Sequence, residues 1–487
     1  MNYQMIGFVI GRILLVEAAL MAVPALTAGI YGESLEPFLV PIAFLVLAGV
    51  LLGFRRPKST ALYARDGLAV VSLAWIVMSL FGAMPFVLSG DIPSYVDAIF
   101  ETVSGFTTTG STILTEVEHL TRGCLFWRSF THWVGGMGVL VFVMAVLPMT
   151  DGHGMHLMRA EVPGPTVGKL VSRMSDTAKI LYGIYLAMTV IEIVLLLAGG
   201  MSFFDACIHA FGTAGTGGFS SRNLSVGAYD SAYFDVVIGI FMLLFGVNFN
   251  LYYFLLIRRF GEVFRSEELK AYLLIVAASV TAITADIVHI YGSVGQSLRY
   301  AFFQVSSIIT TTGYGTADFN TWPTLSKGIL VTLMFVGACA GSTGGGIKVS
   351  RILILVKSSV ADMRRMLHPA AVTTVRLEGK PVSEKTTRGA HVYLSVYVLL
   401  LAGSFLLLSL EGFDLVTTFT ALAACFNNIG PGLEMVGPMG NFSAFSPFSK
   451  LLLSFDMLAG RLEIFPMLLL FAPSIWNRRG RIRRFRG

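Results

Sequence analysis

Charged residues are scarce in this chain of 487 residues. Asp, Glu, Lys and Arg make up only 13% of it, and 55% is hydrophobic. Soluble domains carry about 25% charged residues, so this chain has too few to cover a solvated surface. The composition therefore excludes a soluble protein and predicts an all-α integral membrane protein.

Cysteine is also scarce, and the pattern of the chain favours no catalytic or metal chemistry. The four cysteines are scattered, with no CxxC pair and no histidines at metal-ligand spacing. This excludes a disulfide framework and a zinc site. No nucleophile lies beside a base in the apolar segments, so we expect no enzyme and no cofactor. The cysteines are expected to be small packing residues: Cys124, Cys207, Cys339 and Cys425.

Positive charge is scarce on one side of the predicted membrane topology, which carries six Lys and Arg residues. Of 35 Lys and Arg residues, 27 fall in loops near 54–66, 150–180, 257–270 and 347–389 and in the tail after residue 477. Cytoplasmic loops carry such an excess, so both termini are expected in the cytoplasm. We expect the basic tail to lie against anionic membrane lipid, and not to bind nucleic acid.

Long apolar runs dominate the remaining sequence. A helix needs about 20 residues to cross a ~30 Å hydrocarbon core. Ten runs qualify, and the first is too long for a signal peptide and is expected to be retained. They lie near 6–30, 36–54, 67–90, 126–148, 178–200, 231–257, 270–292, 325–357, 390–410 and 449–475.

The last eight runs flank, in pairs, four loops of similar sequence. Each loop places a glycine after a short amphipathic stretch: FTTTGS at 106–111, TGGFS at 216–220, TTTGYG at 310–315 and NNIGPG at 427–432. We predict four helix–pore loop–helix repeats in a pseudo-four-fold arrangement around one pore. Two leading helices occupy 1–60, and the repeats occupy 61–160, 161–262, 263–375 (with a broken second helix) and 376–487.

The loop composition suits a cation filter. Backbone carbonyls replace the water shell of a dehydrated ion, and glycine readily adopts the backbone conformation that points them inward. The half-helices before the loops would aim their negative C-terminal ends at the ion. TTTGYG is nearest to the TVGYG loop of potassium channels. The expected cation-binding residues of the filter are Thr108, Thr109, Gly110, Gly217, Gly218, Thr311, Thr312, Gly313, Asn428, Ile429 and Gly430.

A glycine run interrupts the span near 325–357, where 340–348 reads AGSTGGGIK. Glycine in a helix interior is less favourable than alanine by about 1 kcal/mol, so three in succession should break the helix. The spacing does not match a phosphate-binding loop. Lys348 and Arg351, which follow the run, are expected to reach the cytoplasmic interface.

Ionisable residues within the apolar runs need a cavity or a partner. Arg461 is expected either to face the pore or to pair with Asp456 or Glu463. A proton- or sodium-coupled potassium symporter is the alternative function, and its candidate coupling carboxylates are Glu192 and Asp286.

Two further carboxylates, Asp97 and Asp205, lie at the starts of two of the predicted half-helices. A carboxylate at that position can accept hydrogen bonds from exposed backbone N–H groups, so we expect both residues to cap these helices.

Together, these motifs resemble the Trk/Ktr/HKT superfamily of potassium transporters, and most closely its bacterial TrkH branch. The resemblance covers the whole chain. It includes GGMG at 135–138, RAEVPGP at 159–165, HAFGTAGTGGFS at 209–220, AGSTGGGIKVSRILIL at 340–355, NNIGPGL at 427–433 and GRLEIF at 460–465.

The resemblance implies a potassium-uptake pore in the bacterial inner membrane, with one filter glycine per loop. It implies a homodimer, one pore per chain, and a cytoplasmic TrkA-like nucleotide-binding regulatory subunit. A serine at the position of Gly110 accompanies sodium transport in related plant proteins, so glycine favours potassium. The implied gate is an intramembrane loop and an arginine, which here are Gly341, Ser342, Thr343, Gly344, Gly345, Gly346 and Arg461.

Overall fold

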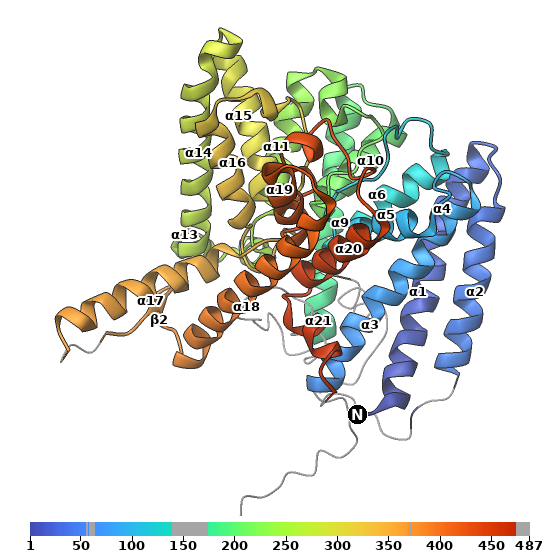
Figure 1. The fold of residues 1–487 in the computed structure, drawn as a ribbon, viewed down its shortest axis with the longest axis horizontal. Coiled ribbons are helices and arrows are strands. Elements are labelled where there is room, and N and C mark those ends of the chain that lie inside the picture. Colours follow the sequence, from blue (N-terminus) through green and yellow to red (C-terminus); the bar gives the residue numbers. More distant parts are fainter. Residues whose placement is uncertain (55–56, 58–63, 139–173, 370–372, 474–487) are drawn as a thin grey trace, which may run out of the picture.

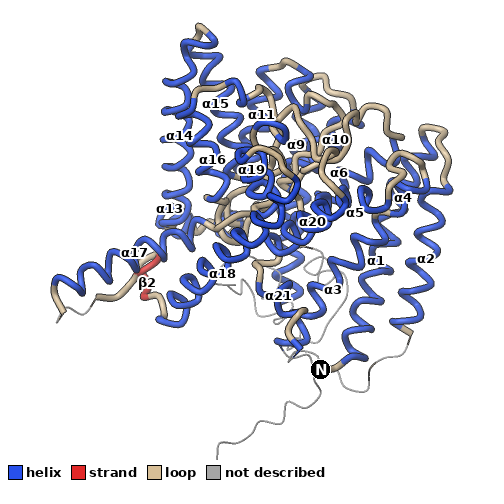
Figure 2. The backbone as a smooth tube through the Cα atoms, viewed as in Figure 1, coloured by secondary structure: helices blue, strands red, loops and turns tan. Residues whose placement is uncertain are grey.

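The computed structural model describes residues 1–54, 57, 64–138, 174–369 and 373–473. Within these ranges the chain is helical apart from one two-stranded hairpin (Figure 2). The RAEVPGP motif, the basic tail and the predicted borders after residues 60 and 160 lie outside the described residues. So does the end of the predicted span 126–148.

Figure 1 shows the helices in chain order. They are α1 (Tyr3–Ile30), α2 (Glu36–Gly53), α3 (Ala64–Gly82), α4 (Met84–Leu88), α5 (Tyr95–Phe106), α6 (Arg122–Gly136), α9 (Met174–Ala198), α10 (Phe203–Gly215), α11 (Ala232–Phe245), α12 (Phe249–Leu256), α13 (Phe260–Arg265), α14 (Glu267–Tyr291), α15 (Val294–Ile309), α16 (Thr324–Phe335), α17 (Val349–Leu367), α18 (Glu384–Leu408), α19 (Leu415–Phe426), α20 (Pro447–Arg461) and α21 (Phe465–Leu470).

The short elements lie in the connections. The 3-10 turns are η1 (Ser225–Tyr229), η2 (Phe319–Thr321), η3 (Ser409–Glu411) and η4 (Glu434–Val436). Strands β1 (Arg376–Leu377) and β2 (Lys380–Pro381) pair antiparallel beside α17, which projects from the main body (Figure 1).

Several helices have the length and composition of membrane spans. Among the described residues, six are long and apolar enough: 3–30, 36–53, 65–88, 176–198, 267–291 and 384–411. Their outward faces carry exposed aliphatic side chains, such as Leu51, Leu274 and Leu399, which are 70–72% exposed. Apolar side chains on the outside suit contact with lipid, so the chain is a helical membrane protein with several spans.

In the second, third and fourth predicted pairs, no single described helix at the second position passes this test. The prediction of a break in 325–357 is confirmed, because α16 and α17 are separated by residues 336–348. The prediction of single helices over 231–257 and 449–475 is wrong. Helices α11 and α12 meet at 92°, and α20 stops before α21 at residues 462–464.

Local chemistry explains these two breaks. The Asn248 side chain accepts a hydrogen bond from the N–H of Asn250, which starts α12 in a new direction. Glu463 and Ile464 have positive φ, 58° and 68°, which a right-handed helix cannot accommodate, so α20 ends before them.

The predicted half-helices correspond to α5, α10, α15 and α19, each of which ends at one of the four glycine loops. The prediction that Asp97 and Asp205 cap α5 and α10 is wrong, because Ser94 and Ser202 accept the hydrogen bonds from the N–H groups of these two aspartates. The caps lie three residues earlier, as is usual for a serine N-cap. Asp97 instead pairs with Lys450 at 2.7 Å, which ties α5 to α20.

Candidate functional site

The four half-helices end in one shared backbone pattern. A left-handed residue comes two positions before each loop glycine, with φ of 58° at Thr108, 56° at Thr216, 59° at Thr311 and 57° at Asn428. The glycines themselves have φ of 81°, 81°, 83° and 102°, at Gly110, Gly218, Gly313 and Gly430. Threonine is β-branched and rarely adopts positive φ, so three such threonines indicate a geometry kept for function.

The same hydrogen bond closes all four turns. The N–H just before each glycine donates to a carbonyl five residues earlier, at 2.8–2.9 Å, in the pairs Thr109–Ser104, Gly217–Gly212, Thr312–Ser307 and Ile429–Ala424. This bond belongs to a helix-ending motif that reverses the chain direction. Each half-helix therefore stops at an equivalent point, and its negative C-terminal end faces the loops.

The four turns contact one another in a closed ring. A side-chain carbon at Gly110 would overlap the carbonyl oxygen of Gly217 in the second loop. A carbon at Gly218 would overlap the carbonyl oxygen of Thr312, and a carbon at Gly313 would overlap the carbonyl oxygen of Ile429. A carbon at Gly430 would lie 2.9 Å from the carbonyl oxygen of Thr109, which returns to the first loop. Each glycine thus lies against the carbonyl that precedes the next glycine, an approach that only glycine permits.

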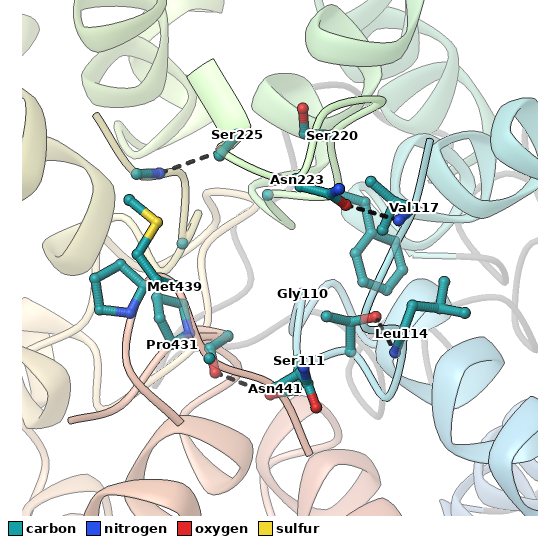
Figure 3. Close-up of a pocket in the computed structure, with 18 of the residues that line it drawn as sticks. Gly110, Ser111, Leu114, Val117, Ser220, Asn223, Ser225, Pro431, Met439 and Asn441 are labelled. Carbon is teal, nitrogen blue, oxygen red and sulfur yellow. Dashed lines mark hydrogen bonds between the residues drawn. The ribbon is translucent and has the colours of Figure 1, made fainter. Parts of the chain in front are cut away.

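A cavity opens on one side of this ring. All four glycines line it, with residues of the four segments that return from the loops. In Figure 3, Gly110, Ser111, Ser220 and Pro431 lie around it. The Ser111 hydroxyl donates to the carbonyl of Gly430 at 3.0 Å, which joins the first and fourth segments.

The predicted filter residues therefore come together in these four turns, and side chains on their other side link them to the glycine loop. The N–H of Gly345 donates to Oγ1 of Thr311 at 2.6 Å. Nδ2 of Asn428 donates to Oγ1 of Thr109 at 2.9 Å. A side-chain carbon at Gly345 would lie 3.0 Å from Cβ of Asn428. The loop thus packs directly against the third and fourth turns.

The loop 336–348 is anchored at several points. Val336 and Ile347 form a β-bridge, so the loop closes on itself. The N–H of Phe249 donates to the carbonyl of Gly341 at 3.0 Å, and Oγ1 of Thr343 donates to the carbonyl of Phe245 at 3.2 Å. These contacts hold the loop against the break between α11 and α12.

Arg461 lies beside the loop and is 7% exposed. Its guanidinium donates to the carbonyl of Thr343 at 2.7 Å, and to those of Gly135 and Gly136 at 2.6 Å each. It therefore connects the loop, the end of α6 and the end of α20. Asp456, one of the two carboxylates considered as its partner, accepts a hydrogen bond from a serine of α18 at 2.8 Å.

The prediction that Lys348 and Arg351 reach the cytoplasmic interface is wrong. They are 1% and 6% exposed. The Lys348 ammonium donates to the carbonyls of Gly344 and Gly345, inside the loop. Arg351 pairs with Glu463, the other carboxylate considered for Arg461. A buried charge needs such partners, and the glycine carbonyls supply them for Lys348.

Sequence reasoning missed two groups that support the turns. Nδ1 of His132 lies 2.7 Å from the carbonyl oxygen of Gly105, and Nε2 lies 3.3 Å from the N–H nitrogen of Phe219. This arrangement fits the neutral tautomer with its proton on Nδ1. Arg128, four residues earlier, pairs with Glu101 at 2.6 Å, and both are buried. The i, i+4 spacing of Arg128 and His132 inside an apolar run was the available signal.

Comparison with known proteins identifies the family. A family model described as "TrkH: Cation transport protein" matches residues 36–478. The chain belongs to the TrkH family. "Trk system potassium uptake protein TrkH" of Escherichia coli K12 is 36% identical over 98% of this chain and 100% of its own length. TrkG of the same organism is 34% identical over 94% of this chain and 95% of its own.

A solved structure has the same fold. The crystal structure of the potassium transporter TrkH from Vibrio parahaemolyticus superimposes with a TM-score of 0.87 at 34% identity, over 98% of this chain and 100% of that one. The predicted superfamily is thus confirmed. As a TrkH family member, the chain is a multi-pass membrane transporter and not an enzyme.

Proposed function

We propose that this chain takes up potassium across the bacterial inner membrane through a channel-like pore, with K⁺ as the transported ion and no bound cofactor. The observation that carries the proposal is the closed ring, in which four glycines each lie against a carbonyl of the next loop. Four converging carbonyls can replace the water around one dehydrated ion. The Trk names of the relatives support potassium as that ion.

The filter of this pore consists of the carbonyl and hydroxyl oxygens of the four turns. The chain around this filter has ten membrane spans. Eight of these spans belong to four helix–pore loop–helix repeats, with the domain borders that the sequence predicts. The shared φ pattern and the shared closing hydrogen bond support four copies of one unit. The filter residues are Thr108, Thr109, Gly110, Gly217, Gly218, Thr311, Thr312, Gly313, Asn428, Ile429 and Gly430.

The gate of the pore is the segment 341–346 with Arg461. Its support is the contact of Gly345 with Thr311, directly beside the ring, and the hydrogen bond from Arg461 to Thr343. The loop blocks the path while these bonds hold. Arg461→Ala removes all three hydrogen bonds of the guanidinium, and the one to Thr343 of the loop, from a charged donor, is worth about 1.5–3 kcal/mol. The substitution should therefore raise ion flux by about tenfold or more.

Regulation of this gate comes from the cytoplasm, where both termini lie. We propose a homodimer, with one pore per chain, that carries a TrkA-like nucleotide-binding regulatory subunit. The Trk system names of the relatives support a partner subunit in general. The concentration of Lys and Arg in loops on one side supports the orientation and a contact with anionic lipid.

The test is a flux assay with the purified protein in liposomes. Potassium, rubidium and sodium influx are measured under an inside-negative diffusion potential, for the wild type, Arg461→Ala and Arg461→Lys. We expect potassium and rubidium to enter faster than sodium, and Arg461→Ala to be the fastest variant. Equal entry of all three ions would overturn the filter, and unchanged flux in Arg461→Ala would overturn the gate.

Proton- or sodium-coupled symport remains the second candidate because of Glu192, which is fully buried in α9. The other candidate, Asp286, accepts hydrogen bonds from the N–H and hydroxyl of Ser326 at 3.1 and 2.6 Å, which suits a structural role. A reversal potential that follows the potassium gradient alone supports the channel. One that moves with an imposed pH or sodium gradient supports symport.

A further inference from the structure

The first turn of α14 makes three contacts to three different parts of the chain. The N-cap Ser266 and the first two helical residues, Glu267 and Glu268, are consecutive, and each side chain reaches another segment. This turn lies where α17 leaves the body of the protein (Figure 1). Because neighbouring residues on one turn move together, these contacts are mechanically linked.

Glu268 holds the glycine loop and the helix that follows it. Its Oε1 atom accepts hydrogen bonds from the N–H of Ala340 at 2.8 Å and from the N–H of Ser350 at 2.9 Å. Ser350 lies in the first turn of α17, whose N-cap Lys348 makes no side-chain cap. A carboxylate from another helix therefore satisfies an end group of α17, at the positive end of its dipole. Glu268 is 5% exposed, so these bonds are shielded from water.

The other two residues bind the cytoplasmic hairpin and α17. The Ser266 hydroxyl donates to Oε1 of Glu378 at 2.8 Å, and Glu267 pairs with Lys357 of α17. The Lys357 ammonium also donates to the carbonyl of Arg376 at 2.9 Å.

The hairpin is compact enough to act as a unit. Its two turn residues, Glu378 and Gly379, have φ of 54° and 75°, as the tight turns that match strand twist require. The N–H of Val382 donates to the carbonyl of Val375 at 2.9 Å, which closes the hairpin beyond its strands.

We propose that Ser266, Glu267 and Glu268 form a junction that couples the hairpin 375–382 to the loop 336–348, with Glu268 as the positioning residue of the loop. Displacement of the hairpin pulls on the first turn of α14 and loosens the hold of Glu268 on Ala340 and Ser350. This inference rests on the proposed gate only for its effect on ion flux. The physical coupling stands by itself.

Cys339 offers a readout that does not depend on transport. It lies within the loop, is fully buried and is one of only four cysteines in the sequence. With the other three changed to alanine, the rate of maleimide labelling in purified protein reports opening of the loop. Size-exclusion profiles show whether each variant is folded.

We expect Glu268→Ala to raise the labelling rate about tenfold, the factor that corresponds to about 1.4 kcal/mol. Glu268→Gln keeps an oxygen acceptor without the charge and should give a smaller rise. Glu262→Ala, in an exposed glutamate of the preceding helix α13, is the matched control and should label as the parent does. If Glu268→Ala does not fold, Glu268→Asp, which is one methylene shorter, replaces it. A parent-like rate in the folded variant would overturn the positioning role.

The coupling is tested by a double-mutant cycle. Glu378→Ala alone should raise the rate of Cys339 labelling about threefold, because part of the free energy of the lost Ser266–Glu378 hydrogen bond is transmitted to the loop. In the Glu268→Ala background, the same change should have no further effect. No effect of the single variant, or independent multiplication of the two effects, would overturn the junction.

Rubidium flux in the same variants separates this inference from the proposed function. Faster labelling with faster flux supports both. Faster labelling with unchanged flux supports the junction and refutes the proposal that the loop is the gate. Unchanged labelling overturns the junction whatever the flux.

Discussion

Two glycines in one loop should respond very differently to substitution. Gly313 has φ of 83°, and a side-chain carbon there would overlap the carbonyl oxygen of Ile429 and lie 3.0 Å from Cδ of Pro431. At Gly315 the nearest atom to such a carbon is Cβ of Pro438, at 3.6 Å, an ordinary contact. Gly313→Ala therefore forces the third and fourth turns apart, and Gly315→Ala does not.

The magnitude follows from the backbone. Left-handed conformation at a non-glycine residue is unfavourable by about 1–2 kcal/mol, before any overlap with Ile429 is counted. If this strain moves the ring out of its ion-binding geometry, potassium should lose about 5- to 30-fold of its advantage over sodium. Gly315→Ala should keep the wild-type ratio. This contrast is informative because both glycines belong to the TTTGYG motif.

The assay measures rubidium and sodium influx into liposomes for the wild type, Gly313→Ala and Gly315→Ala, each normalised to folded protein. Loss of discrimination in both variants would refute the reasoning, because it would show that the ring contact at Gly313 is not what matters. Retained discrimination in Gly313→Ala would refute it more directly.

Three further substitutions test the surroundings of the ring. Lys348→Met removes the ammonium bound to the glycine carbonyls and should raise rubidium flux about tenfold, with Lys385→Met as an exposed control. Arg128→Leu leaves the buried Glu101 without its positively charged partner and should destabilise the protein by about 3–5 kcal/mol, seen as a lower unfolding temperature in detergent; the double change with Glu101→Met should recover most of this loss. His132→Leu removes two hydrogen bonds that join the first and second turns and should lower potassium over sodium selectivity, whereas a fully retained ratio would contradict that role.

The glycine positions were predictable from the sequence because glycine reports a local backbone requirement. Gly110, Gly218, Gly313 and Gly430 recur after similar amphipathic stretches, and the run at 344–346 interrupts an apolar segment. Both signals depend only on residues that lie within a few positions of one another in the sequence. The structure brings the four glycines together and breaks the helix at the run.

The contacts of long polar side chains were not predictable from the sequence in the same way. Lys348 follows the glycine run, and position alone favoured the cytoplasmic interface, but the ammonium turns back to carbonyls that the broken helix leaves free. Glu268 lies at the start of an ordinary apolar span, and its two partners are 72 and 82 residues away. Such contacts depend on tertiary packing and leave no local pattern.

The four turns share one backbone pattern, but only the first and third share the side chains behind it. In the first and third turns, the hydroxyls of Thr107 and Thr109, and of Thr310 and Thr312, lie 2.8 Å apart. In the second turn glycines replace these threonines, at residues 215 and 217.

In place of that threonine pair, the His132 ring fills the space beside Gly217, since a side-chain carbon on this glycine would overlap it. In the fourth turn, Asn427 accepts a hydrogen bond from Tyr397 at 2.8 Å. Because the glycine contacts run from the first turn to the second, third and fourth, the two threonine turns lie diagonally opposite. In the proposed filter, an ion at the centre would therefore meet carbonyls from four turns that are supported in three different ways.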